Sequence, residues 1–381
     1  MYQFIAKTFH GLEFVLEQEL NKLGATEVQK MNRAVSFKGD LSLLYLANMS
    51  LRTALRVIHP LAVDKITDQH QLYDFAKSVN WVDWFTPDKT IAVRAIVSQA
   101  PAFNNSAFVA LKVKDAIADQ FRDHYNKRPF VDKMNPDIQI DVHIHKDTCT
   151  LSIDSTGDSL HRRGYRSTGH KAPLNEMLAA GLVLMSNWDI EKQVFFDPFC
   201  GSGTIMIEAG MIAKNIAPNV HREDFAFKHW KNYENKKNDK AWLVCRSNER
   251  KYEGTLYGSD IHRGSIQLTR DHVTRAKIDD LVRIKCTSFE DRTIPQGPGI
   301  IITNPPYGER LRERDTHELY QRIGNKLKFD CSGYEVWMIS SFPQFNRSLG
   351  LKPNNRKRVF NGALECEYMH FSMYQGKRKG H

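Results

Sequence analysis

The sequence lacks the patterns that define several restricted classes of protein. None of its 6 cysteines forms a C-x-x-C pair, and its 15 histidines show no ligand spacing, so neither a disulfide framework nor a metal site is indicated. No stretch approaches the ~18 apolar residues of a membrane span, and the start of the chain lacks a basic segment followed by an apolar one. We therefore expect a soluble, cytoplasmic protein with reduced thiols and no metal.

Acidic residues are outnumbered by basic ones. The chain carries 54 Lys and Arg against 44 Asp and Glu, which gives a net charge of +10. Residues 1–160 hold 18 basic against 19 acidic residues, whereas residues 161–381 hold 36 against 25, so the excess lies in the second part. A polyanionic partner would explain this excess, and so would a generally solvated surface, because charge alone does not separate the two.

The hydrophobic periodicity predicts two kinds of architecture in succession. Up to residue 156, strand-like runs alternate with amphipathic helices, as in small α+β units. One of these helices is expected over 106–125, with Phe108, Leu111, Ile117 and Phe121 on its apolar side. After a polar connection at 157–169, short apolar runs at helix-length intervals predict a parallel sheet covered on both faces. The expected strands are 194–197, 256–260, 282–286, 300–303 and 336–340, with a closing hairpin from 358–361 and 367–374.

A glycine-bearing turn follows the first of these parallel strands. The strand ends on Asp197, and Gly201 and Gly203 then allow the backbone to turn tightly before a helix that begins near Thr204. A G-x-G pattern without a third glycine is an incomplete dinucleotide fingerprint, so a mononucleoside-like ligand fits better. A plain tight turn would explain the glycines but not the acidic residue before them.

A second carboxylate ends the next strand along the chain. Asp260 would lie at the same sheet edge as Asp197, where an acidic residue can accept the protons of both hydroxyls of a ribose. The alternative is that Asp260 caps the following helix, since Asp is common at that position.

The tetrad Asn304-Pro305-Pro306-Tyr307 follows a buried strand on the same predicted sheet. The two prolines fix the backbone and remove two N–H donors, so the Asn304 side-chain oxygen and the Pro305 carbonyl are left as acceptors. Two acceptors on the N–H groups of a planar amine would aim its lone pair at a methyl donor and stabilise the charge that develops. Tyr307 could stack on the base that carries the amine. Together with the glycine turn, the tetrad indicates methyl transfer to nitrogen.

These motifs resemble the THUMP-domain RNA methyltransferases that use S-adenosylmethionine, particularly the bacterial guanine-N2 methyltransferases of 23S ribosomal RNA. The resemblance covers nearly the whole chain and is carried by the following segments: Gly11-Leu12-Glu13, Asn105–Ile117, Leu160–Arg166, Ala172–Glu176, the glycine turn, and Asn304–Leu311.

The resemblance implies a ferredoxin-like segment (1–61) and a THUMP RNA-binding domain (62–156), joined by a linker (157–169) to a Rossmann-like class I methyltransferase domain (170–376) and a basic tail (377–381). It also implies that Asn304, Pro305 and Tyr307 are catalytic. Ser288 is expected to accept a hydrogen bond from the adenine amine of the cofactor, a contact that an Asp makes in many relatives. The residues implied in binding S-adenosyl-L-methionine are Pro173, Leu174, Asp197, Phe199, Cys200, Gly201, Gly203, Thr204, Asp260, Ile261, Ser288, Phe289 and Asn304.

Basic residues near the predicted site are candidate contacts for RNA phosphates. They are Arg162, Arg163 and Arg166 before the catalytic domain, and Arg310 and Arg312 after the tetrad. An insertion between 216 and 254, rich in Lys, Arg and Trp, could also grip RNA or could be a solvated helical excursion. We interpret Cys200 as a packing residue, because a cysteine nucleophile serves pyrimidine-carbon methylation and not an amine clamp.

The expected activity is methylation of the N2 amine of a guanine in 23S ribosomal RNA or in an assembling large subunit. Methylation of the adenine N6 amine is a rival, because the same tetrad can hold that amine. A protein glutamine side chain is a further rival substrate. A non-enzymatic RNA-binding or assembly factor is disfavoured by the intact glycine turn and tetrad.

Overall fold

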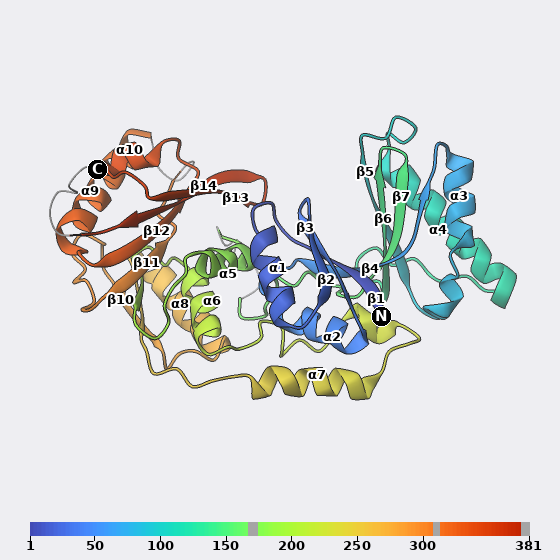
Figure 1. Ribbon diagram of the computed structural model, residues 1–381, viewed down its shortest axis with the longest axis horizontal. Coiled ribbons are helices and arrows are strands. Elements are labelled where there is room, and N and C mark those ends of the chain that lie inside the picture. The colour runs from blue at the N-terminus through green and yellow to red at the C-terminus, as the bar shows by residue number, and fades with distance from the viewer. Residues whose placement is uncertain (167–173, 308–312, 375–381) are drawn as a thin grey trace. The chain divides into compact units, whose positions relative to one another are not determined.

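The computed structural model describes residues 1–166, 174–307 and 313–374, and these form two compact units (Figure 1). The first unit consists of 1–8, 16–160 and 219–245, and the second consists of 9–15, 161–218 and the residues from 246 onward. No helix among the described residues combines the length and the apolar character that a membrane crossing requires.

The first unit is built on one sheet with the strand order β2-β3-β1-β4-β7-β6-β5. Its pairings are antiparallel except between β5 and β6. The strands are β1 (Tyr2–Lys7), β2 (Thr26–Met31), β3 (Ala34–Gly39), β4 (Arg56–Lys65), β5 (Ile91–Ser98), β6 (Ile138–His145) and β7 (Thr148–Asp154).

Two of these strands, β2 and β4, were not anticipated from the sequence. β2 is exposed at nearly every position, so it lacks the apolar alternation that marks a half-buried strand. β4 contains Pro60, and its pairing with β7 shifts register between Pro60 and Ala62. A proline and an irregular register both weaken a strand pattern.

The N-terminal region carries the helices α1 (Glu13–Lys22), α2 (Leu41–Ser50), α3 (Gln69–Ser78) and α4 (Ser106–Tyr125), and the short turn η1 (Trp81–Asp83). The predicted bounds of α4 are confirmed, because the Asn105 side chain caps its first turn and Asn126 ends it in the left-handed conformation. The predicted apolar side was partly wrong: Phe108 is 40% exposed and Leu111 is 54% exposed. The buried residues are Val109, Val113, Ala116, Ile117, Gln120 and Phe121, which recur at helical spacing one face away.

Residues 219–245 belong to the first unit although they lie between two strands of the second unit in sequence. They contain η2 (Ala226–His229) and most of α7 (Asn235–Ser247). The ring of Phe227 lies 4.4 Å from that of Tyr45, and Trp230 lies 5.4 Å from Trp84. Burial of these aromatic rings explains why residues 219–245 pack with the N-terminal sheet, although we expected them to belong to the methyltransferase domain (170–376).

The second unit contains a sheet with the order β10-β9-β8-β11-β12-β14-β13. Strands β8 to β12 are parallel, and β14 runs antiparallel to both of its neighbours. The strands are β8 (Val194–Asp197), β9 (Leu256–Asp260), β10 (Val282–Cys286), β11 (Gly299–Thr303), β12 (Tyr334–Ser340), β13 (Asn355–Asn361) and β14 (Leu364–Ser372). These positions confirm the predicted parallel strands and the closing hairpin.

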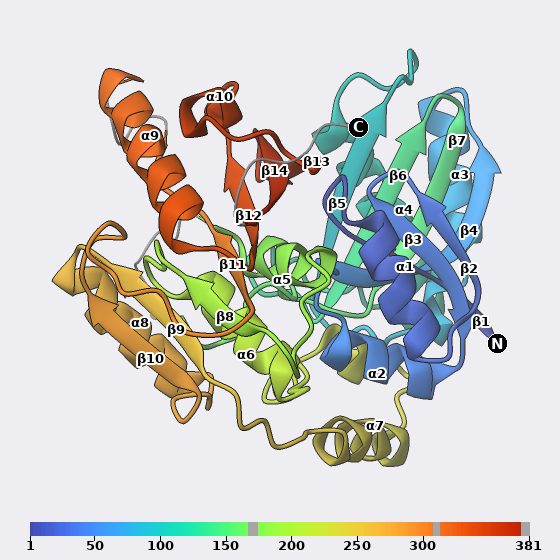
Figure 2. The ribbon, with the colours of Figure 1, turned by 60° about the vertical axis from the view of Figure 1, so that its left-hand side comes forward.

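Helices cover both faces of this sheet (Figure 2). On one face, Phe196, Ile301 and Val336 join a core cluster with α9 (Glu313–Asp330) and α10 (Phe345–Leu349). On the other face, α6 (Thr204–Ala213) and α8 (Arg263–Arg275) pack against β8 to β10, and α5 (Glu176–Met185) packs against α6. The apolar runs of β8, β11 and β12 are therefore strands that are buried on both faces, whereas the edge strand β10 is largely exposed.

Candidate active site

The site lies where the strand order of the catalytic sheet reverses. β8 is flanked by β9 on one side and by β11 on the other, and both neighbours run parallel to it. The carboxyl ends of β8 and β11 are therefore adjacent, and the Thr303 hydroxyl donates a 2.6 Å hydrogen bond to Asp197 Oδ1 across them. Ligands of open parallel sheets bind at such a point. The glycine turn after Asp197 and the tetrad after Thr303 meet at one crevice.

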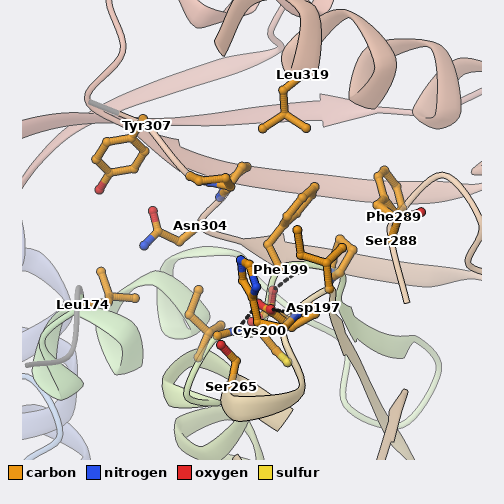
Figure 3. Close-up of a pocket in the computed structure, with 18 of the residues that line it drawn as sticks. Leu174, Asp197, Phe199, Cys200, Ser265, Ser288, Phe289, Asn304, Tyr307 and Leu319 are labelled. Atoms are coloured by element: carbon orange, nitrogen blue, oxygen red, sulfur yellow. Dashed lines mark hydrogen bonds between the residues drawn. The ribbon is translucent and has the colours of Figure 1, made fainter. Parts of the chain in front are cut away.

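A cavity of about 1040 Å³ occupies this crevice. Its volume is at the upper end of the range for small-molecule sites, which leaves room for a cofactor and part of a substrate. Figure 3 shows Asn304, Tyr307 and Leu174 at one end, Ser288 and Phe289 at the other, and the loop from Asp197 to Cys200 between them. The predicted residues that line the cavity are Leu174, Asp197, Phe199, Cys200, Gly201, Thr204, Asp260, Ile261, Ser288, Phe289, Asn304, Pro305 and Tyr307.

Two side chains of α8 contact carbonyl groups of the glycine turn. Thr269 donates a 2.7 Å hydrogen bond to the carbonyl of Gly201, and His272 Nδ1 lies 3.0 Å from the carbonyl of Ser202. Gly203 has φ +83°, and a Cβ placed on it would lie 2.6 Å from Thr269 Cγ2. Gly203 is therefore required both by its conformation and by the close approach of α8. Gly201 also has positive φ, but no heavy atom lies within 4 Å of the position of a Cβ there.

Asp197 is a buried carboxylate with one oxygen available to a ligand. Both of its hydrogen bonds, from the Thr303 hydroxyl and the Phe199 N–H, are made to Oδ1, and Oδ2 accepts none from any described residue. Burial raises the pKa of Asp197 to about 7, while the bonds from Thr303 and Phe199 oppose that rise. A cationic ligand group next to Oδ2 would favour the ionised form. This position suits the ammonium group of an amino-acid moiety.

Asp260 ties the end of β9 to the glycine turn. Its Oδ2 accepts the N–H of Gly201 at 3.1 Å and its Oδ1 accepts the N–H of His262 at 2.8 Å. His262, and not Asp260, occupies the N-cap position of α8. Each carboxylate oxygen can accept a further hydrogen bond, so the geometry is compatible with binding of ribose hydroxyls.

The tetrad presents an acceptor that the protein itself does not use. Asn304 Oδ1 is buried and has no hydrogen-bond partner among the described residues. An unsatisfied buried oxygen costs about 1–3 kcal/mol, which a donor on a bound ligand would recover. The Tyr307 hydroxyl lies 4.0 Å from Cys366 Sγ of β14, so its ring lies beside the closing hairpin.

At the opposite end of the cavity, the predicted role of Ser288 is not supported by its contacts. The Ser288 hydroxyl donates to Asp291 Oδ2 at 2.7 Å and accepts the Asp291 N–H at 3.1 Å, so it closes a local turn. Asp291 and Glu290 also line the cavity, and sequence reasoning missed both. The signal was present as two acidic residues directly after Phe289. Phe289 itself is 1% exposed and packs 5.8 Å from the ring of Phe199.

The structure corrects the prediction for two of the linker arginines. The Arg163 side chain is 1% exposed and lies 3.6 Å from the buried carboxylate of Glu208, so it does not reach a phosphate. Arg166 donates to the carbonyl of Leu174 at 2.6 Å and to the Thr204 hydroxyl at 2.7 Å. Arg166 therefore links Leu174, which lines the cavity, to Thr204 at the start of α6. Arg162 is exposed, as a phosphate contact requires.

Of the predicted residues not yet discussed, Cys200 is described by the structure and three others are not. Burial raises the pKa of the Cys200 thiol well above its usual range, which disfavours the thiolate that a nucleophile would need. Pro173, Arg310 and Arg312 lie outside the described residues. Within the ranges that the structure describes, no cluster of His, Cys, Asp or Glu could hold a metal ion.

Three known protein families match successive segments of the chain. Residues 163–370, more than half of the chain, match the family described as the RMKL-like methyltransferase domain. Residues 67–154 match the THUMP domain, and residues 3–58 match the RlmL ferredoxin-like domain.

Individual relatives extend over nearly the full chain. A Synechocystis sp. protein with the provisional name RNA methyltransferase slr0064 is 37% identical over 97% of both chains. Ribosomal RNA large subunit methyltransferase K/L of Shewanella frigidimarina is 36% identical over 98% of this chain, which spans about half (53%) of that relative. The solved structure of SMU.472, provisionally described as a methyltransferase and complexed with SAH, superposes with a TM-score of 0.88 at 27% identity over 99% of both chains. The chain therefore belongs to the THUMP-domain, RlmL-like class I methyltransferases and uses S-adenosyl-L-methionine.

Proposed function

We propose that the chain methylates the exocyclic N2 amine of a guanine in large-subunit ribosomal RNA. The observation that carries this proposal is the buried Asn304 Oδ1 at the carboxyl end of β11, next to the glycine turn, which no residue in the described ranges partners. An acceptor in that position calls for an N–H donor from the substrate. The names of the K/L relatives supply ribosomal RNA as the substrate class, and the match of residues 67–154 to the THUMP domain favours RNA over protein.

The chain's residues would prepare the amine for attack. When bound, S-adenosyl-L-methionine supplies an electrophilic methyl group. Asn304 Oδ1 and the Pro305 carbonyl oxygen accept the two N–H groups of the amine, which fixes its orientation and directs its lone pair. The same oxygens stabilise positive charge as it develops on the nitrogen. No general base is required before attack, because the amine becomes acidic only when it is alkylated.

The cofactor would occupy the rest of the cavity. Asp197 Oδ2 would receive the ammonium group of the methionine moiety, Asp260 the ribose hydroxyls, and Asp291 the adenine amine. Because the cavity lies at the carboxyl edge of the sheet, the target base would have to leave its stack to reach Asn304. Arg162 and, outside the described residues, Arg310 and Arg312 are the proposed phosphate contacts.

The function is tested by methylating deproteinised ribosomal RNA with tritiated S-adenosylmethionine and digesting the product to nucleosides. We expect the label in N2-methylguanosine. Label in N6-methyladenosine would replace the proposal with adenine methylation. Assembling large-subunit particles serve as a second substrate, because naked RNA can lack the required structure, and label only in the proteins of these particles would favour glutamine.

The charge of Asp197 is expected to make cofactor binding dependent on pH. With a pKa of about 7 in the free enzyme, the carboxyl is largely protonated below pH 6 and ionised above pH 8. Affinity for S-adenosylhomocysteine should therefore rise as pH increases through 7. Asp197→Asn should weaken binding at pH 8 by about 10- to 100-fold, the value of a hydrogen bond to a charged group, and should flatten the pH profile. Calorimetric titration from pH 5.5 to 8.5 measures both.

Whereas cofactor affinity should rise with pH, the stability of the ligand-free protein should fall as pH increases through the same range. The pKa of Asp197 is raised on folding from an unfolded value of ~3.9, so the carboxyl destabilises the folded state increasingly as pH rises from 4 to 7. Asn at 197 keeps both hydrogen bonds to Oδ1 and removes the charge. Asp197→Asn should therefore raise the melting temperature at pH 8, and should raise it much less at pH 4.5, where only a small part of this cost has developed. A variant that is destabilised at pH 8 would contradict this account of the site.

Tyr307 is expected to contribute through its ring and not through its hydroxyl. Stacking on a base is a property of the aromatic ring, which Tyr307→Phe keeps, so this variant should retain most activity. Tyr307→Ala should raise KM for RNA by about 5- to 100-fold, which corresponds to loss of a base-stacking contact of ~1–3 kcal/mol. Steady-state kinetics with saturating cofactor separates the two variants. Equal losses in both would assign the role to the hydroxyl.

A further inference from the structure

A side-chain hydrogen bond joins the carboxyl ends of β8 and β11. Thr303 is the last residue of β11 and Asp197 is the last residue of β8, and each is 1% exposed. The Thr303 hydroxyl donates to Asp197 Oδ1 at 2.6 Å, which lies in the range of hydrogen bonds from a hydroxyl to an ionised carboxylate. The backbone pairing of the two strands ends earlier, at Phe196 and Ile301. The two side chains therefore continue the contact between the strands beyond the backbone ladder.

Thr303 itself does not line the cavity. Asp197 and Asn304 both line it (Figure 3), whereas Thr303 is bonded to the first and precedes the second in the chain. A role of Thr303 in ligand binding therefore has to act through one of these two neighbours. Its β-branched side chain has few favourable rotamers, so the strand backbone sets the direction of the hydroxyl.

The two hydrogen bonds to Asp197 differ in origin. The Phe199 N–H, two residues further along the chain, donates to Oδ1 at 3.2 Å and belongs to the local turn. The bond from Thr303 comes from another strand and is the shorter of the two. Because both donors meet Oδ1, the planar carboxylate is held by one oxygen, and Oδ2 is left to accept a hydrogen bond from a ligand.

The bond from Thr303 also favours the charged form of Asp197. Burial raises the pKa of Asp197 to about 7, and the carboxylate of Asp260 adds to the rise. The Thr303 hydroxyl opposes this rise more strongly than the Phe199 N–H does. Cys200 also interacts electrostatically with Asp197, and β11 carries no charged residue. Loss of the hydroxyl should therefore raise the pKa of Asp197 further and leave the carboxyl mostly protonated at neutral pH, which makes it a poor partner for an ammonium group.

We propose that Thr303 is a positioning residue for the cofactor: its hydroxyl holds Asp197 Oδ1, so that an ionised Oδ2 is presented to the ammonium group of the methionine moiety. This inference rests on the proposed function, because it requires that Asp197 receive that ammonium group. Thr303 directly precedes Asn304, so the end of one strand would serve both reactants. It would orient the carboxylate for the methyl donor through Thr303 and hold the amine through Asn304.

Thr303→Val tests the proposal in the full-length protein, because valine keeps the β-branched shape and replaces the hydroxyl with a methyl group. A hydrogen bond to a charged group is worth about one to two pH units in the pKa of its acceptor. Affinity for S-adenosylhomocysteine should therefore fall by about 5- to 20-fold at pH 7 and return to within about twofold of the wild type at pH 9. Calorimetric titration without RNA from pH 5.5 to 9 measures this profile. The other titratable residues that line the cavity are the same in both proteins: His262, Glu290, Asp291, Tyr307, Asp315 and Arg322.

The shape of the pH profile decides between positioning and packing. A loss of the same factor at every pH would show that Thr303 acts through packing alone. No loss at pH 7 would show that Asp197 does not depend on Thr303. Either result overturns the inference.

Thr303→Ser and Thr303→Ala form a matched pair, because both remove the γ-methyl group and only serine keeps the hydroxyl. The serine variant should keep the wild-type midpoint of the pH profile, and the alanine variant should shift it upward as valine does. Equal profiles for serine and alanine would contradict the inference. The pair gives this answer even if the valine variant fails to fold.

A double variant tests whether the effect passes through Asp197. In the Asp197→Asn background the side chain at 197 cannot ionise, so Thr303→Val should lower the affinity by a smaller factor at pH 7 than it does in the wild type. It should also leave the affinity independent of the charge at 197 across the pH range. An equal factor in both backgrounds would mean that Thr303 does not act through the carboxylate.

The inference and the proposed function fail in distinguishable ways. Cofactor binding is measured without RNA, so the results for Thr303 do not depend on which base is methylated. If no N2-methylguanosine forms while the pH profiles follow the prediction, only the proposed substrate fails. If N2-methylguanosine forms and Thr303→Val differs from the wild type by one constant factor at every pH, only the inference about Thr303 fails.

Discussion

Asn304→Ala should lower kcat by at least about 10²- to 10³-fold, the cost of removing one preorganised charge-stabilising group from an active site. The Asn304 side-chain oxygen has no partner among the described residues, so its removal breaks no hydrogen bond to that oxygen within this part of the chain. Affinity for S-adenosylhomocysteine and the melting temperature should therefore stay close to the wild-type values. Single-turnover kinetics with saturating RNA and cofactor measures the chemical step directly.

The matched control for this variant is Asn355→Ala, an exposed asparagine at the start of β13 that does not line the cavity. It should keep full activity. If Asn304→Ala retained a large part of the wild-type rate, the amine would have to be oriented by other groups, and the assignment of Asn304 would be wrong.

Gly203→Ala is expected to be the most damaging substitution in the cofactor loop. An Ala at φ +83° costs about 1–2 kcal/mol in backbone strain, and the clash with Thr269 Cγ2 adds about 1–3 kcal/mol because Thr269 is buried. For a protein of this size, in which 1 kcal/mol corresponds to a shift of about 1.2 °C, we expect the melting temperature to fall by roughly 3–6 °C. Affinity for S-adenosylhomocysteine should fall with it, since the loop must shift. Differential scanning calorimetry and titration calorimetry measure the two effects.

A double variant separates the clash from the strain. Thr269→Ser removes Cγ2 and keeps the hydroxyl that donates to the Gly201 carbonyl, so Gly203→Ala/Thr269→Ser should regain part of the lost stability. Gly201→Ala shares the positive φ but meets no heavy atom within 4 Å. It should lose less stability than Gly203→Ala, while cofactor affinity falls because the added methyl group enters the cavity. No rescue by Thr269→Ser would mean that packing of α8 does not limit the loop.

The central strands of the catalytic sheet were predictable from sequence because β8, β11 and β12 are buried at nearly every position. Such strands are continuous apolar runs with sharp ends, and the predicted strands 194–197 and 300–303 match β8 and β11 to within one residue. The exposed edge strand β2 has no comparable pattern, and β4 is interrupted by Pro60. The sequence also did not indicate that residues 219–245 pack with the N-terminal sheet, because that packing depends on aromatic contacts distant in the chain.

The candidate site was predictable to the extent that its residues follow strand ends. Asp197, Asp260 and Asn304 each end a strand or follow one directly, and the parallel topology brings those ends together. Side-chain partners were not predictable in this way. Arg163 faces a buried glutamate instead of solvent, and Ser288 bonds to Asp291 instead of presenting its hydroxyl to the cavity.

Nothing in the local sequence indicated that Asn361 would line the cavity. It lies in a hairpin turn whose Asn-Gly sequence is explained by turn chemistry alone, and only the pairing of β14 with β12 brings it to the cavity. The residues predicted to bind the cofactor thus follow from local motifs, whereas the part of the cavity that the hairpin lines depends on the tertiary fold.

A crystal structure of the protein with S-adenosylhomocysteine and an RNA fragment containing the target nucleotide would test the central claim most directly. We predict that the guanine N2 nitrogen lies within about 3.2 Å of both Asn304 Oδ1 and the Pro305 carbonyl oxygen, the range of N–H···O hydrogen bonds. A target base bound with its N2 amine directed away from Asn304, or a cofactor bound away from the glycine turn, would contradict the account.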